Sequence, residues 1–161
     1  MPPLSAGYET HAALLAPVPE EHLVAGSAVA DMYGKVAFGS RAWEVFRNLD
    51  VLRGDHPVTA YLYASHPVEH RGPKVTWEGL YVGHVESRGG AYPGSKRLRP
   101  PTTAEYQEDR AGYWAVYWHV SSLQPLDADE WVDIADLRNF KTQRRYGQGF
   151  VPEGPIVVGH P

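Results

Sequence analysis

Two short segments rich in arginine and lysine carry the side chains best suited to bind phosphate. They are SKRLRPP, which begins at residue 95, and RNFKTQRRYGQG, which begins at residue 138. Because the chain has a formal net charge of −4, these segments are local concentrations of positive charge on an acidic protein. Solvated loop charge is the alternative interpretation. The candidate phosphate contacts are Lys96, Arg97, Arg99, Arg144 and Arg145.

Aromatic side chains are the second group that could bind a ligand. The chain has five Trp and ten Tyr, more than packing alone usually requires in 161 residues. In GYWAVYWHVSSLQPL, residues 112–126, aromatic residues fall on both faces of a predicted strand. Proteins hold an unstacked nucleobase between aromatic rings, and each stacked base contributes about 1–3 kcal/mol. For any single ring, core packing is the alternative.

The histidines do not predict a metal site. His66 and His70 have the spacing of a helical metal pair, but Pro67 interrupts any regular helix there. His84 and His119 lie on predicted strands, where each could bond a ligand or another residue of the sheet. The chain has no cysteine, which excludes disulfides, thiolate zinc sites and a thiol nucleophile. We therefore expect no metal and no cofactor.

No catalytic residue is assigned. The sequence contains no Gly-x-Ser-x-Gly elbow, and RGGAYPGSK lacks the phosphate-loop pattern. Two acidic pairs fall at predicted helix starts, where negative charge is stabilising for structural reasons. These pairs are Glu20-Glu21 and Asp129-Glu130.

The elements that must position these residues alternate between strands and helices. Trp43, Phe46 and Leu49 predict one helix after the N-cap residue Ser40, and Asp127 with Glu130 predicts another. This order suits a small mixed α+β domain whose sheet curls around one core. The predicted elements are strands at 11–18, 58–65, 79–87, 113–120 and 154–160, a short strand at 74–77, helical turns within 19–35, helices at 40–53 and 125–140, and a long loop over 88–112.

Length and composition predict one domain. A chain of 161 residues with 43% hydrophobic and 21% charged residues can bury a single core. We expect a loose tail over residues 1–7 and one domain over 8–161. The N-terminus lacks the pattern of a signal peptide, and no apolar run is long enough to span a membrane. These features favour a cytoplasmic protein without a membrane partner.

The order of short motifs resembles that of the EVE domain, a member of the PUA-like superfamily that also contains the ASCH and YTH domains. An apolar strand leads into Pro-Glu, a Gly-x-Arg segment opens a helix, and a Gly-Asp turn leads to a strand ending in Tyr-x-Ser. A Val-Gly strand, an Ala-Tyr-Pro turn and a Trp-rich strand follow. The matching segments are ALLAPVPEEH, AFGSRAWEVFRNL, RGDHPVTAYLYAS, YVGHVES, GGAYPG and YWAVYWHVSSLQPLDADEW.

The resemblance implies a fold, a pocket and a partner. The fold would be a curled mixed sheet, a pseudo-barrel of about five or six strands, with flanking helices. Its pocket would accept a flipped-out, modified base of DNA or RNA, with Arg41 and Ser65 at the pocket and Trp43 at its rim. We expect the strand after Gly112 to be mainly scaffold, with at most one of its aromatic rings near the pocket. The predicted base pocket is Arg41, Trp43, Tyr63, Ser65, Trp77 and Trp118.

Two other functions stay open at this point. The first is an ASCH-like amidohydrolase acting on a modified nucleoside, for which Lys74, Thr76 and Glu78 would be candidates because they cluster in sequence. The ASCH Gly-x-Lys-x-x-Glu signature is absent, since Lys96 is not followed by a glutamate at the required spacing. The second is a protein-interaction domain that presents exposed Tyr and Trp side chains to a partner.

Overall fold

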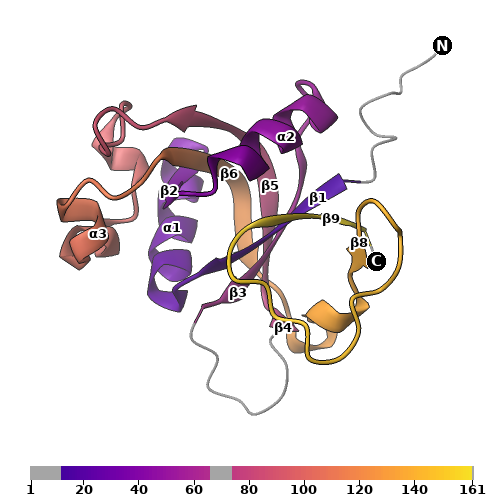
Figure 1. Ribbon diagram of the computed structural model, residues 1–161. Coiled ribbons are helices and arrows are strands. Elements are labelled where there is room, and N and C mark those ends of the chain that lie inside the picture. The colour runs from indigo at the N-terminus through magenta and orange to yellow at the C-terminus, as the bar shows by residue number, and fades with distance from the viewer. Residues whose placement is uncertain (1–11, 66–73, 161) are drawn as a thin grey trace.

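The computed structural model describes residues 12–65 and 74–160, which form a mixed sheet with helices packed against it (Figure 1). The predicted tail and the pair His66 and His70 lie outside the described residues. The described helices are α1 (Glu20–Tyr33), α2 (Trp43–Arg53) and the short α3 (Gln107–Arg110). The strands are β1 (Ala12–Val18), β2 (Val36–Ser40), β3 (Val58–Ala64), β4 (Lys74–Val75), β5 (Trp77–Glu86), β6 (Val116–Pro125), β7 (Val132–Asp133), β8 (Arg138–Asn139) and β9 (Ile156–Gly159).

Seven of these strands form one sheet in the order β2-β6-β5-β3-β1-β9-β8, and β4 pairs with β7 in a separate ribbon. β1 and β3 run parallel, and every other pair in the sheet is antiparallel. The α+β class with a mixed sheet and flanking helices is confirmed. The expected pseudo-barrel of five or six strands is not: the described sheet has seven strands, and its edge strands β2 and β8 do not pair with each other.

The sheet is covered on both faces, and β3 shows how. Ala60 and Leu62 belong to the larger core, which the sheet forms with α1 and α2. Tyr61 and Tyr63 point to the opposite face and pack with Ile134 and other residues of the C-terminal segment. The alternation predicted from the sequence is therefore confirmed, and it explains why β1, AALLAPV, is apolar throughout.

The helix predicted at 125–140 is wrong. The expected capping box forms between Asp127 and Glu130, but the helix ends after one 3₁₀ turn at Ala128–Glu130. Val132 then pairs with Val75 in the β4–β7 ribbon, and Ile134 is buried in the second core. Tertiary pairing and burial override the local helix signal here.

Smaller corrections concern the first half of the chain. α1 is a full helix of 14 residues where we expected a turn or two. β2 was not predicted, and Ser40 is its last residue instead of the helix N-cap. Ala42 precedes α2, and its backbone N–H donates to the Ser40 hydroxyl at 3.0 Å. Among the described helices, none has the length and apolar character needed to cross a membrane.

Candidate functional site

An aromatic cavity of about 460 Å³ opens where the C-terminal ends of β1 and β2 meet the segment that contains α3. Its volume lies in the range of about 300–1,000 Å³ that is typical of small-molecule sites. We call it the first cavity. Its aromatic lining is Phe38, Tyr106, Tyr113, Trp114 and Trp118, joined by His22, and its charged lining is Arg41, Arg99, Glu108, Asp109 and Glu153.

The indole of Trp114 is fixed in the wall of this cavity by three contacts. It lies so close to the backbone of Gly39 that a Cβ atom there would be 2.5 Å from the indole Cγ, so only glycine leaves room for the ring. The indole N–H donates to Asp109 Oδ1 at 2.8 Å. Tyr113 meets the indole edge to face at 5.0 Å. The stacking surface is therefore formed before any ligand arrives.

Asp109 also neutralises the cation in the wall. Arg99 Nη2 donates to the two carboxylate oxygens of Asp109 at 2.6 and 2.5 Å, and Nη1 donates to the carbonyl oxygen of Ala37 at 2.8 Å. The guanidinium lies over the Tyr117 ring at 4.9 Å, and the Arg99 side chain is 9% exposed. Arg99, predicted as a phosphate contact, is thus a paired and buried part of the pocket wall.

Arg41 is the exposed cation at the rim. Its Nη1 donates to the carbonyl oxygen of Tyr113 at 3.1 Å, and its guanidinium stacks on the Tyr113 ring at 4.7 Å. These contacts orient the side chain without neutralising its charge. Arg41 can therefore meet an anionic group at the mouth of the cavity.

His22 contributes a neutral ring to the opposite wall. Burial lowers the pKa of His22, and the nearby Arg99 lowers it further, against the opposing influence of Glu21 and Asp109. Nδ1 bonds the Thr102 hydroxyl at 2.7 Å, and the ring meets Tyr106 edge to face at 4.4 Å. Around neutral pH this wall is uncharged and largely aromatic.

Trp118 carries an unsatisfied donor. The residue is 1% exposed and packs between Phe38, at 5.1 Å, and Phe46, at 5.5 Å. Within residues 12–65 and 74–160, its indole N–H is the one buried side-chain polar group that lacks a hydrogen-bond partner. Such a group costs about 1–3 kcal/mol unless an acceptor reaches it.

Of the six predicted base-pocket residues, only Arg41 and Trp118 line the first cavity. Trp77 is buried, and its indole N–H donates to the Glu20 carboxylate at 3.3 Å. Tyr63 is buried in the second core, donates to the carbonyl oxygen of Pro152 at 3.1 Å, and has its pKa raised by burial to about 12.

The last two predicted residues lie near the first cavity without lining it. The backbone N–H of Ser65 donates to the carbonyl oxygen of Val18, a lining residue, at 3.2 Å. Trp43 lines a second cavity.

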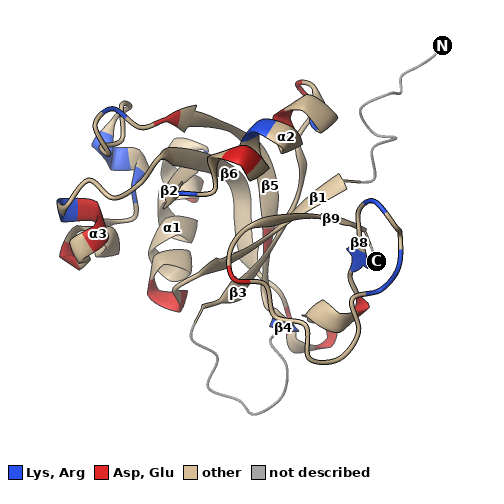
Figure 2. Cartoon of the chain, in the orientation of Figure 1, with Lys and Arg blue, Asp and Glu red and all other residues tan. Residues whose placement is uncertain are grey.

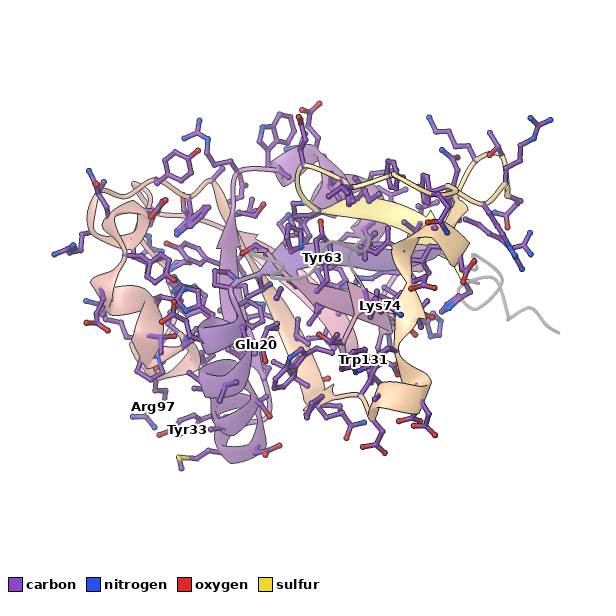
Figure 3. The ribbon with its side chains drawn as sticks, turned by 90° about the horizontal axis from the view of Figure 1, so that it is seen from below. Glu20, Tyr33, Tyr63, Lys74, Arg97 and Trp131 are labelled. Atoms are coloured by element: carbon purple, nitrogen blue, oxygen red, sulfur yellow. The ribbon has the colours of Figure 1, made fainter. Side chains whose placement is uncertain are left out.

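The two arginine-rich segments lie on opposite sides of the molecule (Figure 2). Lys96 and Arg97 are exposed in a 3₁₀ turn, and Arg97 lies over the Tyr33 ring of α1 at 5.4 Å (Figure 3). Arg144 and Arg145 are exposed in the loop after β8. The structure therefore does not join the five predicted phosphate contacts into one patch.

Several residues of the first cavity were not predicted. Tyr113 and Trp114 stand in the Trp-rich segment that we expected to be mainly scaffold, and with Trp118 they place three of its rings at the cavity. The sequence carried no signal for this, because both residues continue the alternating pattern of the predicted strand at 113–120, whereas β6 begins only at Val116. Nothing in the sequence indicated that Asp109 would pair with Arg99, because the 3₁₀ turn at Pro101–Glu105 and α3, which bring the two together, lie in a segment that we expected to be a loop.

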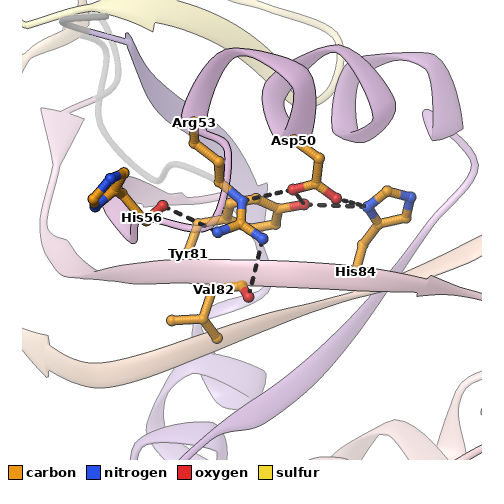
Figure 4. Close-up of polar contacts among 6 residues, drawn as sticks. All are labelled: Asp50, Arg53, His56, Tyr81, Val82 and His84. Carbon is orange, nitrogen blue, oxygen red and sulfur yellow. Dashed lines mark hydrogen bonds and ion pairs between the residues drawn. The ribbon is translucent and has the colours of Figure 1, made fainter. Parts of the chain in front are cut away.

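The second cavity, of about 550 Å³, lies between α2 and the end of β5. Asp50 organises its polar wall (Figure 4). Oδ1 accepts from Arg53 Nε at 2.7 Å and from the Tyr81 hydroxyl at 2.9 Å, and Oδ2 lies 2.6 Å from His84 Nδ1. The Trp43 ring, 42% exposed, forms another wall beneath the Arg47 guanidinium at 4.7 Å.

Metal ligands do not gather at either cavity within the described residues. The single group of acidic or histidine side chains close enough to share an ion is the exposed cluster of Asp127, Asp129 and Glu130. Asp127 and Glu130 form the capping box described above, which accounts for their proximity.

A scan against protein-family models finds no match to this sequence, and a search of curated proteins finds none. The chemistry of the two cavities is therefore argued from their own geometry.

Proposed function

We propose that this chain is a cytoplasmic, non-enzymatic reader that binds a flipped-out, modified base of DNA or RNA in the first cavity. The observation that carries the proposal is the preformed Trp114 surface in a cavity lined by aromatic rings. A nucleobase has flat apolar faces and a polar edge. The aromatic rings of this cavity can stack on the faces, and its polar groups can bond the edge. The mixed sheet with flanking helices is compatible with the PUA-like fold that the EVE resemblance implies, and we include that fold in the proposal.

The polar edge of the base would meet Trp118. A ring nitrogen or carbonyl oxygen of the base would accept from its unpaired indole N–H. The gain is larger than for an average hydrogen bond because the donor is already desolvated.

Preference for a modified base follows from the apolar lining. Burying one extra methyl group against aromatic rings contributes about 0.8 kcal/mol or more. A well-shaped pocket can turn such a group into roughly 10- to 200-fold discrimination. The cost of extruding a base, a few kcal/mol, must be met by contacts outside the cavity. We assign these to Arg41 at the rim and to the exposed cations Lys96, Arg97, Arg144 and Arg145.

The amidohydrolase alternative gains no support. Lys74 pairs with Asp133 at 3.3 Å in the β4–β7 ribbon, and neither Lys74, Thr76 nor Glu78 lines the two cavities.

A panel of oligonucleotides of one sequence tests the proposal. Each member would carry, at one position, cytosine, 5-methylcytosine, 5-hydroxymethylcytosine, adenine or N6-methyladenine, in DNA and in RNA. Fluorescence anisotropy should show at least a tenfold preference for one modified member, and Trp114→Ala should abolish that preference. Trp131→Ala is the control, because Trp131 is exposed and bonds the Leu126 carbonyl oxygen away from the cavity. Equal, weak binding to all members would contradict the proposal and favour the protein-interaction alternative.

A further inference from the structure

The two cavities lie on either side of one ridge of the protein. Arg41 and Ala42 line the first cavity, and the next residue, Trp43, lines the second. Likewise Trp114 lines the first and Ala115 the second. Two residues of extended chain span at most roughly 7 Å, so the cavities are neighbours.

The ridge is held rigidly. The backbone N–H of Ala115 donates to the carbonyl oxygen of Ser40 at 2.9 Å, which ties the two crossing segments together. On the other side, the N–H of Ser87 donates to the carbonyl oxygen of Ala115 at 2.9 Å. The distance between the cavities is therefore fixed by backbone hydrogen bonds and does not depend on flexible side chains.

The second cavity offers a stacking surface and a cation. The Trp43 ring, which is 42% exposed, can stack on any base, because every base presents a flat π-face. Arg47 extends over the same ring and can contact a phosphate beside that base.

The second cavity also offers a fixed hydrogen-bond acceptor. The Asp50 carboxylate accepts from Arg53 and Tyr81, and the tautomer of His84 that carries its proton on Nδ1 donates to it as well. The Tyr81 hydroxyl, 3.2 Å from the same Nδ1, holds the ring further. In that tautomer Nε2 is an acceptor, and it points away from Asp50 (Figure 4). A sugar hydroxyl or a base amino group is the matching donor.

We propose that the second cavity binds the nucleotide next to the flipped base, with its base stacked on Trp43. Arg47 contacts the connecting phosphate and His84 Nε2 accepts from a hydroxyl or amino group. This inference rests on the proposed function, because it needs a base in the first cavity, but it assigns a separate site to separate residues. It makes the protein a reader of at least two consecutive nucleotides.

The test compares a mononucleoside with a trinucleotide. The mononucleoside is the panel member that binds best, and the trinucleotide places it between two thymidines. The trinucleotide should bind the wild-type chain more tightly. Trp43→Ala should weaken trinucleotide binding by about 5- to 150-fold, the contribution of one stacked base, and leave mononucleoside binding within twofold. Trp43→Phe should restore most of the loss.

Trp131→Ala is the matched control, because Trp131 and Trp43 are each 42% exposed. It should change neither affinity. Unchanged trinucleotide binding in Trp43→Ala would overturn the inference while leaving the proposed function intact. Equal losses for both ligands would also overturn it, because Trp43 would then act on the first cavity or on the fold. If no mononucleoside or oligonucleotide of the panel binds the wild-type chain, the proposed function fails and this inference fails with it.

Discussion

The two cavities are built from the same two crossing segments, yet they treat their polar groups in opposite ways. In the first cavity, Arg99 and the Trp114 indole are both bound to Asp109 inside the wall. In the second, three donors converge on Asp50, and this arrangement leaves one imidazole nitrogen directed away from the carboxylate.

The difference concerns what each cavity can recognise. A wall in which Asp109 already pairs with Arg99 and Trp114 selects a ligand by shape and apolar contact, with the buried Trp118 N–H as an unpaired donor. A wall with an oriented acceptor and an exposed ring recognises hydrogen-bond donors and tolerates many bases. In our proposal the first cavity therefore detects the modification and the second holds the neighbouring nucleotide. The predictions below test this contrast.

The largest expected effect is a loss of folding stability when the wall of the first cavity is changed. Asp109→Ala leaves the Arg99 charge buried without its partner and also removes the acceptor of Trp114. Loss of one partner of a buried pair costs about 3–5 kcal/mol, so the free energy of unfolding in urea should fall by that amount. Asp136→Ala is the control, because its contact with Arg145 at 3.9 Å is exposed. It should change stability by less than about 0.5 kcal/mol.

The next effect concerns a buried histidine of β6. Burial lowers the pKa of His119 to about 4, and Lys35 and His84 act in the same direction. The unfolded chain takes up this proton near pH 6.5 and the folded chain only near pH 4, so stability should fall by roughly 3 kcal/mol across that window as the pH decreases.

Urea denaturation at several pH values would measure this contribution. His119→Gln can keep the bond to the Tyr92 hydroxyl, which lies 2.8 Å from Nε2, and should flatten the fall between pH 6.5 and 4. His56→Gln, at an exposed site, should leave the profile as in the wild type. Identical profiles for the wild type and His119→Gln would contradict the assignment.

A smaller effect tests whether the stacking surface is preformed. Gly39→Ala introduces a methyl group where Trp114 now lies, and relieving that overlap should cost about 1–3 kcal/mol. The indole must move, so near-ultraviolet circular dichroism should change and the preference for the modified base should fall. Gly154→Ala, whose added methyl group meets open space at the same cavity, should have almost no effect on stability. A stable Gly39→Ala protein with unchanged spectra would show that Trp114 is not held as described.

The smallest effects are expected at the exposed cations. Each phosphate contact contributes about 0.7–0.9 to the slope of log K against log salt concentration. The double variants Lys96→Gln/Arg97→Gln and Arg144→Gln/Arg145→Gln should each lower that slope for a long oligonucleotide. Neither should alter it for the trinucleotide, which is bound over the two cavities. If the slope is unchanged in both double variants, these four residues do not contact phosphate.

The sequence predicted those parts of the molecule that local patterns determine. The alternation in β3 correctly separated Tyr61 and Tyr63 from Ala60 and Leu62, because a strand imposes a period of two. The helix at 125–140 failed because Ile134 is buried by distant residues, a contact that no local pattern encodes.

The candidate site was less predictable, for a related reason. Two of its decisive contacts join distant segments, Gly39 with Trp114 and Arg41 with Tyr113. The third joins Arg99 to Asp109 across a 3₁₀ turn and α3 that the sequence did not predict. The sequence shows that arginine and tryptophan side chains are present, but not which of them meet in the folded chain. Which side chains pair depends on how the segment between β5 and β6 folds. This fold places Arg99 in the wall of the first cavity and leaves Arg41 at its rim.

The five tryptophans allow one direct test of the central claim, because each gives a separate indole N–H signal in a ¹H–¹⁵N spectrum. On addition of the preferred modified mononucleoside, the signals of Trp114 and Trp118 should shift, and the trinucleotide should also shift that of Trp43. Trp77, bonded to Glu20, and Trp131, bonded to Leu126, should stay in place with both ligands. Shifts confined to Trp77 or Trp131, or no shift at Trp114 and Trp118 at saturating ligand, would contradict the assignment of the first cavity as the base site.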